Sequence, residues 1–129
     1  MSDYRFQKHF TLAEARALLP ELRQLFRDIH RRRDAVRQAD ETLREQLVQT
    51  GGDLGGKMVA GLLLDLLQLN RQVRHIQALG ILVKDFDRGL VDFPHLRDGR
   101  EVFLCWELDE DDIEFWHEVD AGYAGRERL

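Results

Sequence analysis

The sequence has one cysteine, two prolines and no long hydrophobic run. Cys105 has no second cysteine to pair with, which excludes an intramolecular disulfide. The beginning of the chain lacks the apolar core of a secretory signal. The most apolar run, residues 58–69, contains Asp65 and is shorter than the roughly 20 residues that a membrane-spanning helix needs. We therefore expect a cytoplasmic protein with no membrane segment.

Basic residues are also fewer than acidic ones. The chain has 19 lysines and arginines against 24 aspartates and glutamates, a formal net charge of −5 and a pI near 5.5. Proteins that bind nucleic acid through their overall charge are normally basic, so this class is disfavoured. The 129 residues, of which 43% are hydrophobic and 33% charged, fit one globular domain over residues 1–129 with a heavily charged surface.

The first half of the chain has the pattern of helices. Thr11 and Glu14 have the spacing of a capping box, which predicts a helix that begins at Leu12. Pro20 cannot donate a backbone hydrogen bond, so we expect a short helix to end there and a long one to begin. From Pro20 to Val48 an apolar residue recurs every three or four positions, which forms one stripe along a helix. The stripe contains Leu22, Leu25, Ile29, Val36, Ala39, Leu43 and Leu47, and Arg32 interrupts it.

A glycine-rich segment, residues 50–57, predicts a turn after this helix. A second apolar stripe follows with alternating steps of three and four, the spacing of a coiled-coil seam. Its members are Val59, Leu62, Leu66, Leu69, Val73 and Ile76. Gly80 suits the C-terminal cap of this helix. Residues 12–79 are thus predicted to form the helical part of the chain, a short helix followed by a long antiparallel hairpin. Since a small domain covers little of such a hairpin, we expect a homo-oligomer, with a dimer as the first choice.

The second half, residues 80–129, has the pattern of short strands. Residues 81–86, 89–94 and 100–108 are rich in β-branched and aromatic side chains and are separated by turn signals, which predicts a three-stranded antiparallel meander. The last of these strands is apolar on both faces, so we expect both faces to be covered. The acidic residues before Ile113 predict a short C-terminal helix. The fold class is therefore α+β.

The whole chain resembles a bacterial and archaeal family known as domain of unknown function 2203. The resemblance rests on the opening "FTLAEARALLPEL" and on motifs in the second half. These motifs are "VKD" at 83–85, "GLVDFP" at 89–94, "DGRE" at 98–101, "LCW" at 104–106, "WHE" at 116–118 and "GR" at 125–126. The resemblance implies no activity.

Polar and aromatic residues are concentrated in the second half, where they are candidate ligand-binding residues. They are Asp85, Asp92, Arg100, Glu101, Trp106, Trp116, His117 and Arg126. In one interpretation they line a cleft for a small anionic or polar ligand. In the other, which the sequence favours, they fasten the sheet by ion pairs and tryptophan packing, with Arg100 or Arg126 clamping Asp85 or Asp92.

A divalent metal is the alternative for the same region. Glu114 and His117 have a Glu-x-x-His spacing, which on a helix directs both side chains along one face, and Asp92 would be a third ligand. The spacing occurs once, and acidic residues at a helix start are commonly capping charges. A single cysteine argues against a tight zinc site, and Cys105 itself, in an apolar strand, is expected to be an inert packed thiol. No catalytic residue and no cofactor is therefore favoured.

A run of arginines between Arg31 and Arg37 is a third candidate site. On a helix these side chains spread over more than one face, and aspartates at 28, 34 and 40 are placed to pair with them. Nucleic-acid binding would favour aromatic side chains among the basic ones, and no aromatic residue occurs between Phe26 and Phe86. We expect a salt-bridged surface, with Arg32 bridging to an acid on the facing helix.

These observations rank three functions. The first is a non-catalytic cytoplasmic binding or scaffold protein that self-associates through its helical hairpin and binds an unknown protein or a small polar ligand through its C-terminal region. The alternative is a metal-dependent enzyme that uses His117 and nearby carboxylates. Nucleic-acid binding through Arg31–Arg37 comes third.

Overall fold

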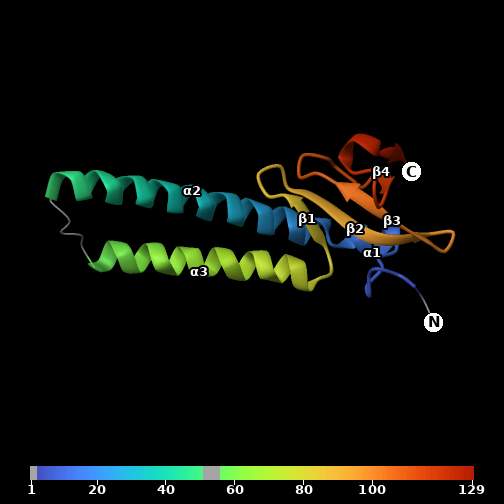
Figure 1. Cartoon of the computed structure of the whole chain (residues 1–129), viewed down its shortest axis with the longest axis horizontal. Helices are drawn as coiled ribbons and strands as arrows, with labels where there is room; N and C mark the ends of the chain where they lie inside the picture. Colours follow the sequence, from blue (N-terminus) through green and yellow to red (C-terminus); the bar gives the residue numbers. More distant parts are fainter. Residues whose placement is uncertain (1–2, 51–55) are drawn as a thin grey trace. The chain divides into compact units, whose positions relative to one another are not determined.

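A computed structural model describes residues 3–50 and 56–129 of the chain (Figure 1). The chain forms two compact units. Unit 1 joins the first 26 residues to Ile76–Leu129, and unit 2 is Arg27–His75. The α+β class is confirmed. Among the described residues, no helix has the length and apolar character required to cross a membrane.

Helix α1 (Leu12–Ala17) begins with the predicted capping box. Thr11 Oγ1 accepts a hydrogen bond from the Glu14 amide at 3.0 Å, and the Thr11 amide donates to Glu14 Oε1 at 2.9 Å. Helix α2 (Leu19–Thr50) follows after Leu18. Pro20 lies in the first turn of α2, where its missing N–H removes no intrahelical bond. The predicted change from a short to a long helix is therefore confirmed.

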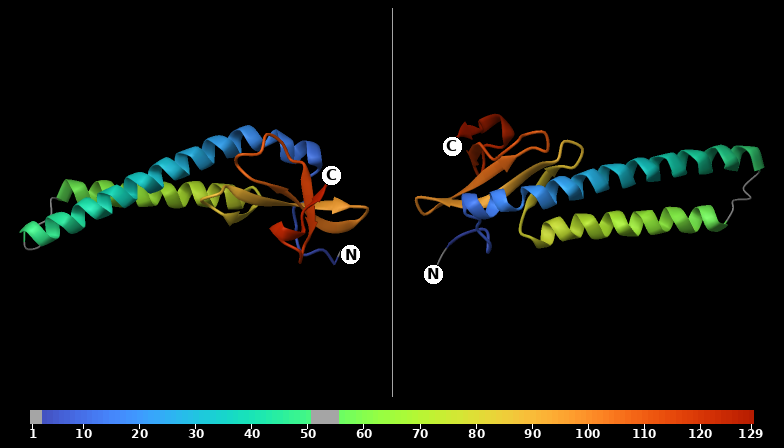
Figure 2. Two further views of the ribbon diagram at one scale, coloured as in Figure 1. Left: turned by 90° about the horizontal axis from the view of Figure 1, so that it is seen from above. Right: turned by 180° about the vertical axis from the view of Figure 1, so that it is seen from behind.

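In unit 2, α2 and α3 (Gly56–Ala78) run side by side in opposite directions (Figures 1 and 2). Residues 51–55, which carry most of the predicted turn, lie outside the described residues. Arg32 Nε donates to Gln72 Oε1 at 3.2 Å, and its Nη1 lies 3.8 Å from Asp65 Oδ1. The predicted bridge from Arg32 to an acid of the facing helix is confirmed. Leu66, predicted for the seam, is instead 42% exposed.

The sheet of unit 1 has five antiparallel strands in the order of the sequence. They are β1 (Leu82–Asp85), β2 (Leu90–Arg97), β3 (Arg100–Trp106), β4 (Phe115–Glu118) and β5 (Glu127–Arg128). The predicted meander corresponds to β1, β2 and β3, and the two further strands were not predicted.

The predicted C-terminal helix is wrong. Phe115–Glu118 form strand β4, and Tyr123–Gly125 form a single 3-10 turn, η1. Aromatic residues favour strands, and β3 would otherwise expose a row of unpaired backbone groups along one edge. Pairing β4 with that edge satisfies these groups and buries Trp116 and His117. The acidic residues before Ile113, which are expected to begin a helix, belong to the turn that precedes β4. There Asp112 Oδ1 accepts a hydrogen bond from the Ile113 amide at 2.8 Å.

Strand β3 is the centre of unit 1. Its residues from Val102 to Trp106 are all buried, so the prediction that both faces are covered is confirmed. One face carries Val102, Leu104 and Trp106, which share that face with Phe93 of β2. The other face carries Phe103 and Cys105. Each of these residues therefore has a neighbour on its own face of the sheet. A one-residue change of register would move each set of side chains to the opposite face.

Two turn glycines give a matched test of this packing. Gly89 and Gly99 both have positive φ, +62° and +79°. A Cβ on Gly89 would lie 2.6 Å from Leu108 Cβ, whereas a Cβ on Gly99 would have no atom within 4 Å. We expect Gly89→Ala to lower the free energy of unfolding by about 2–5 kcal/mol and Gly99→Ala by about 1–2 kcal/mol, measured by urea denaturation. Equal losses would contradict the close approach of Leu108.

Candidate functional site

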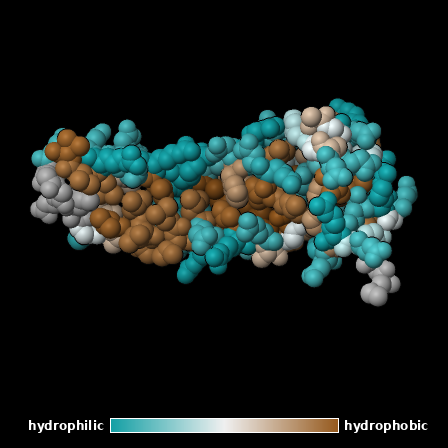
Figure 3. Space-filling view, in the orientation of Figure 1, coloured by the Kyte–Doolittle hydropathy of each residue, from teal (hydrophilic) through white to brown (hydrophobic). Residues whose placement is uncertain are grey.

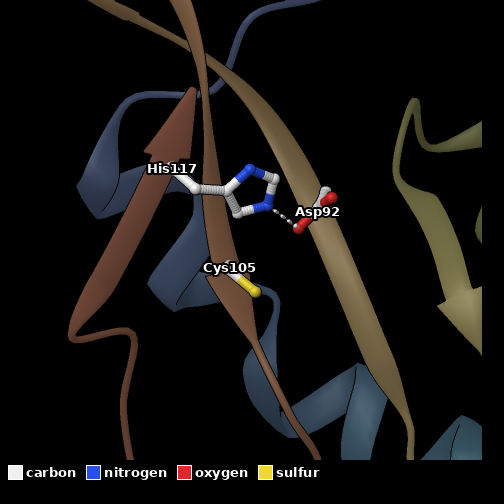
Figure 4. A group of neighbouring side chains, drawn as sticks. All are labelled: Asp92, Cys105 and His117. Carbon is white, nitrogen blue, oxygen red and sulfur yellow. Dashed lines mark hydrogen bonds and ion pairs between the residues drawn. The ribbon is translucent and has the colours of Figure 1, made fainter. Parts of the chain in front are cut away.

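Three buried polar side chains meet on one face of the sheet of unit 1 (Figure 4). They are Asp92 of β2, Cys105 of β3 and His117 of β4, with exposed fractions of 2%, 1% and 1%. The register pairs Asp92 with Cys105 and Phe103 with His117. Since alternate residues of a strand share a face, this register brings all three side chains to the same side. We call this group the Asp-Cys-His cluster.

Hydrogen bonds fix the His117 ring on both sides. Its Nε2 lies 3.0 Å from Asp92 Oδ1, and its Nδ1 lies 2.7 Å from the Glu118 carbonyl oxygen. A carbonyl only accepts, so Nδ1 carries a proton and donates it. One further proton lies between Nε2 and the Asp92 carboxylate, since a hydrogen bond between them requires a proton on one of the two. The imidazole therefore directs Nε2, and not Nδ1, into the cluster.

Cys105 completes the cluster. One side-chain donor atom from each of the three residues lies within 4.8 Å of the other two. Burial, and after it the negative charge of Asp92, raises the pKa of the Cys105 thiol to about 12. The thiol is thus protonated at neutral pH, which agrees with the expectation of an unreactive cysteine. Its position beside Asp92 and His117 was not predicted.

An ion pair flanks the cluster. Arg126 Nη2 donates to both carboxylate oxygens of Glu110, at 2.8 and 2.7 Å. The guanidinium lies over the Phe115 ring, 4.0 Å from its centroid, and 4.7 Å from the Tyr123 centroid. Burial is the largest single effect and lowers the pKa of Arg126, but the hydrogen bond to Glu110, the electrostatic interactions with Cys105 and Glu110 and the contact with Tyr123 together raise it above its ordinary value. Arg126 therefore stays charged, and Glu110 balances its charge.

The predicted clamps on Asp85 and Asp92 are wrong. Arg100 pairs with Glu118 at 2.7 Å, Arg126 pairs with Glu110, and Asp92 is held by His117. Asp85 Oδ1 accepts from the Arg88 amide at 3.1 Å. The sheet register explains the difference. Arg100 lies at the hairpin end of β3, five residues or roughly 17 Å from Cys105, the residue that faces Asp92.

Only two of the three predicted metal ligands, Asp92 and His117, come together, because Phe115–Glu118 form strand β4 and not a helix. Glu114 does not join them. Glu114 precedes β4, is exposed, and lies 4.0 Å from Arg128 Nη1. Residues three apart on a strand point to opposite faces, whereas on a helix they would share one. Asp92 and His117 do meet, and Cys105 takes the place that the sequence assigned to Glu114.

The remaining predicted ligand-binding residues do not converge with the cluster. Trp106 Nε1 donates to the Glu110 carbonyl at 3.0 Å, and Trp116 lies under the Arg97 guanidinium, 4.3 Å from its ring centroid. Arg100 and Glu101 line a shallow hollow of about 670 Å³. Tryptophan packing and ion pairs thus occupy most of these side chains. Binding of a ligand by them stays a prediction.

The N-terminal segment is fixed by Glu101, a contact that the sequence did not reveal. The Glu101 carboxylate accepts from the amides of Arg5 and Phe6, at 2.7 and 3.0 Å, and lies 2.8 Å from His9 Nε2. Phe6 packs against Phe103, with 5.3 Å between ring centroids, on the face that carries the cluster. Burial raises the pKa of Glu101, but the hydrogen bonds outweigh it and lower the pKa below its ordinary value of 4.5.

This lowered pKa predicts that acid releases the N-terminal segment. A carboxylate whose pKa is lower in the folded state stabilises that state above its unfolded pKa, and this stabilisation disappears as the pH falls through the folded pKa. We expect the hydrogen-exchange protection of the Arg5 and Phe6 amides to fall as the pH drops below 4.5. In Glu101→Gln the protection should be low at every pH. The Phe103 amide, inside β3, serves as the reference, and unchanged protection in the variant would contradict the assignment.

The Asp92–His117 contact predicts strong coupling between two buried residues. Removing one partner leaves the other buried without its hydrogen bond, so Asp92→Leu and His117→Leu should each cost about 3–5 kcal/mol of unfolding free energy. The double variant leaves no orphaned polar group and should lose clearly less than the sum of the single losses. Urea denaturation in the presence of a chelator measures all four chains. Additive losses would show that the two side chains do not interact.

Comparisons with known proteins agree with the sequence resemblance. A family described as "Uncharacterized conserved protein (DUF2203)" matches residues 8–129, nearly the whole chain. Searches of curated proteins and of solved structures give no match. The chain belongs to the DUF2203 family.

Proposed function

We propose that this chain is a non-catalytic binding or scaffold protein that self-associates through the α2–α3 hairpin. The observation that carries the proposal is the uncovered apolar surface of unit 2. Among the described residues of Arg27–His75, only Ile29 and Leu43 are buried apolar side chains. Two helices with apolar stripes of this length normally bury several residues each. The other described apolar residues of the hairpin are half-buried or exposed.

A row of exposed leucines on α3 forms one part of this surface. Leu63, Leu64, Leu66 and Leu67 are 57%, 61%, 42% and 58% exposed. Positions 63, 66 and 67 are three and four residues apart, so they share one face of the helix. Figure 3 shows hydrophobic side chains gathered over α3 and at the far end of α2, where Leu47 and Val48 are exposed. Contiguous apolar surface of this kind marks an interaction site.

A second copy of the hairpin is the occupant that fits this surface. The 23 residues of α3 span about 34 Å at 1.5 Å per residue, and two adjacent helices are about 20 Å wide. The resulting face covers about 700 Å², close to the roughly 800 Å² that each partner contributes to a standard interface. Two hairpins packed in this way form a four-helix bundle with the same patch on both copies, as a two-fold dimer requires.

The proposed dimer would also bind a ligand or a partner protein through unit 1. The polar and aromatic C-terminal region would bind a partner protein or a small polar ligand, and the hollow beside Arg100 and Glu101 is the place for it in unit 1. The lone cysteine favours the cytoplasm as the compartment.

The arginine run favours no second function. Arg31 pairs with Asp28, Arg33 lies 3.3 Å from Asp34, and Arg32 bridges to Asp65. Acidic partners thus neutralise these side chains, which differs from the continuous basic stripe of a nucleic-acid interface. A metal at the C-terminal region would depend on a different set of ligands from the one that the sequence predicted.

Adjacent residues on α3 provide a matched test of self-association. Leu67→Glu and Gln68→Glu add the same charge at neighbouring exposed positions, but only Leu67 belongs to the leucine row. We expect the wild-type chain to sediment as a dimer, Gln68→Glu to behave like it, and Leu67→Glu to dimerise at least tenfold more weakly. The reason is that a carboxylate in an apolar interface loses hydration without gaining a partner.

Analytical ultracentrifugation over a range of concentrations measures this constant, with circular dichroism as the check on folding. A monomeric wild-type chain, or equal dimerisation of the two variants, would overturn the proposal.

A further inference from the structure

We infer that the Asp-Cys-His cluster binds one divalent cation of the Zn²⁺ class. The cluster lies in the sheet of unit 1, and its role does not depend on the proposed self-association of the hairpin. Three potential ligands from three neighbouring strands converge there: the Asp92 carboxylate, the Cys105 sulfur and His117 Nε2.

The donor set selects the kind of cation. Sulfur and imidazole ligands favour zinc and similar transition metals, whereas magnesium and calcium prefer oxygen ligands alone. Zinc binds sulfur at about 2.3 Å and nitrogen or oxygen at about 2.0–2.2 Å, so ligands in a tetrahedron lie about 3.3–3.6 Å from each other. The 3.0 Å from Nε2 to Asp92 Oδ1 and the 4.8 Å limit on all three donor atoms are compatible with this geometry after small shifts.

The orientation of His117 is that of a metal ligand. A histidine that binds metal through one ring nitrogen usually donates the other N–H to a carbonyl or carboxylate, which fixes the tautomer. His117 Nδ1 donates to the Glu118 carbonyl at 2.7 Å, and Nε2 is directed at the cluster. The neutral form of this ring therefore presents a lone pair on Nε2, the atom that would bind the cation.

Charge balance also fits one divalent cation. A thiolate, a carboxylate and a neutral imidazole carry −2 in total, which one dication neutralises. Binding releases two protons, one from the Cys105 thiol and one from the Asp92–His117 contact, so the net charge of the buried cluster is zero before and after. The Arg126–Glu110 pair beside it is neutral by itself. A buried site without net charge avoids the large cost of an uncompensated ion in the protein interior.

Three protein ligands leave at least one coordination position of a tetrahedral ion for a small non-protein ligand. Zinc sites with three protein ligands commonly keep such a position open, and sites with four close it. The structure thus assigns a metal-binding role to the two residues that the sequence named, Asp92 and His117, and to the cysteine that it regarded as inert.

Cobalt titration of the whole chain tests this inference. Co²⁺ substitutes for Zn²⁺ and gives a charge-transfer absorption when a thiolate binds it. After treatment with chelator and dialysis, we expect the wild-type chain to bind one Co²⁺ with this absorption, to lose the absorption on addition of Zn²⁺, and to unfold at a higher temperature with either ion.

Two variants test the proposed ligands, and two further variants are controls. Cys105→Ala should abolish the charge-transfer band, and Asp92→Asn should weaken Co²⁺ binding at least tenfold. Glu114→Gln removes a nearby carboxylate that lies outside the cluster, and it should bind Co²⁺ like the wild type. Leu67→Glu, in the hairpin, should also bind like the wild type, which separates a failure of this site from a failure of self-association.

Two outcomes would overturn the inference. One is a folded wild-type chain that shows no charge-transfer band at stoichiometric Co²⁺. The other is unchanged binding in both Cys105→Ala and Asp92→Asn. Circular dichroism before each titration shows whether the variant is folded. If Cys105→Ala does not fold, Asp92→Asn decides the matter, since it keeps the size and one hydrogen-bond acceptor of the original side chain.

Discussion

The pairing of β4 with β3 is the constraint on which the rest of unit 1 depends. This pairing covers one edge of the central strand, buries Trp116 on one face of the sheet and places His117 on the other. It also sets the position of β5, which pairs with β4, and it brings Glu118 within reach of Arg100. A shift of one residue would direct His117 to the opposite face and Trp116 toward Asp92. The Asp-Cys-His cluster therefore exists only in this register.

The two units differ in how much of their apolar surface they bury. Unit 1 packs residues on both faces of β3, and the N-terminal segment covers one of these faces, where Phe6 lies against Phe103. Unit 2 has two helices and a bridge from Arg32 to Asp65 and Gln72, and among its described residues it buries little. A small domain has limited surface with which to cover a long hairpin. This difference in burial supports the proposed separation of ligand binding, in unit 1, from self-association, in the hairpin.

Local patterns in the sequence predicted the elements whose determinants are local. The capping box at Thr11, the change of helix at Pro20 and the three meander strands depend on neighbouring residues, and they were found. The strand at 115–118 was missed because acidic residues followed by aromatic ones suit a helix start as well as a strand after a turn. Only the unpaired edge of β3, which is a tertiary feature, decides between them.

The candidate site could be predicted only in part for the same reason, since its geometry depends on tertiary contacts. Asp92 and His117 were named from their chemistry, but Cys105 was set aside because burial in an apolar strand is its most visible property in a sequence. The register that places it opposite Asp92 requires the sheet. The contacts of Glu101 with Arg5, Phe6 and His9 join residues more than ninety positions apart, and no spacing rule reports them.

The β-sheet register holds His117 with Nδ1 on the Glu118 carbonyl and Nε2 against Asp92. A long-range proton–nitrogen NMR correlation spectrum of the metal-free chain tests it most directly, because it reports which ring nitrogens of His117 carry protons. We expect a proton on Nδ1. A neutral ring with its only proton on Nε2 would contradict both the hydrogen bond to Glu118 and the cluster that depends on it.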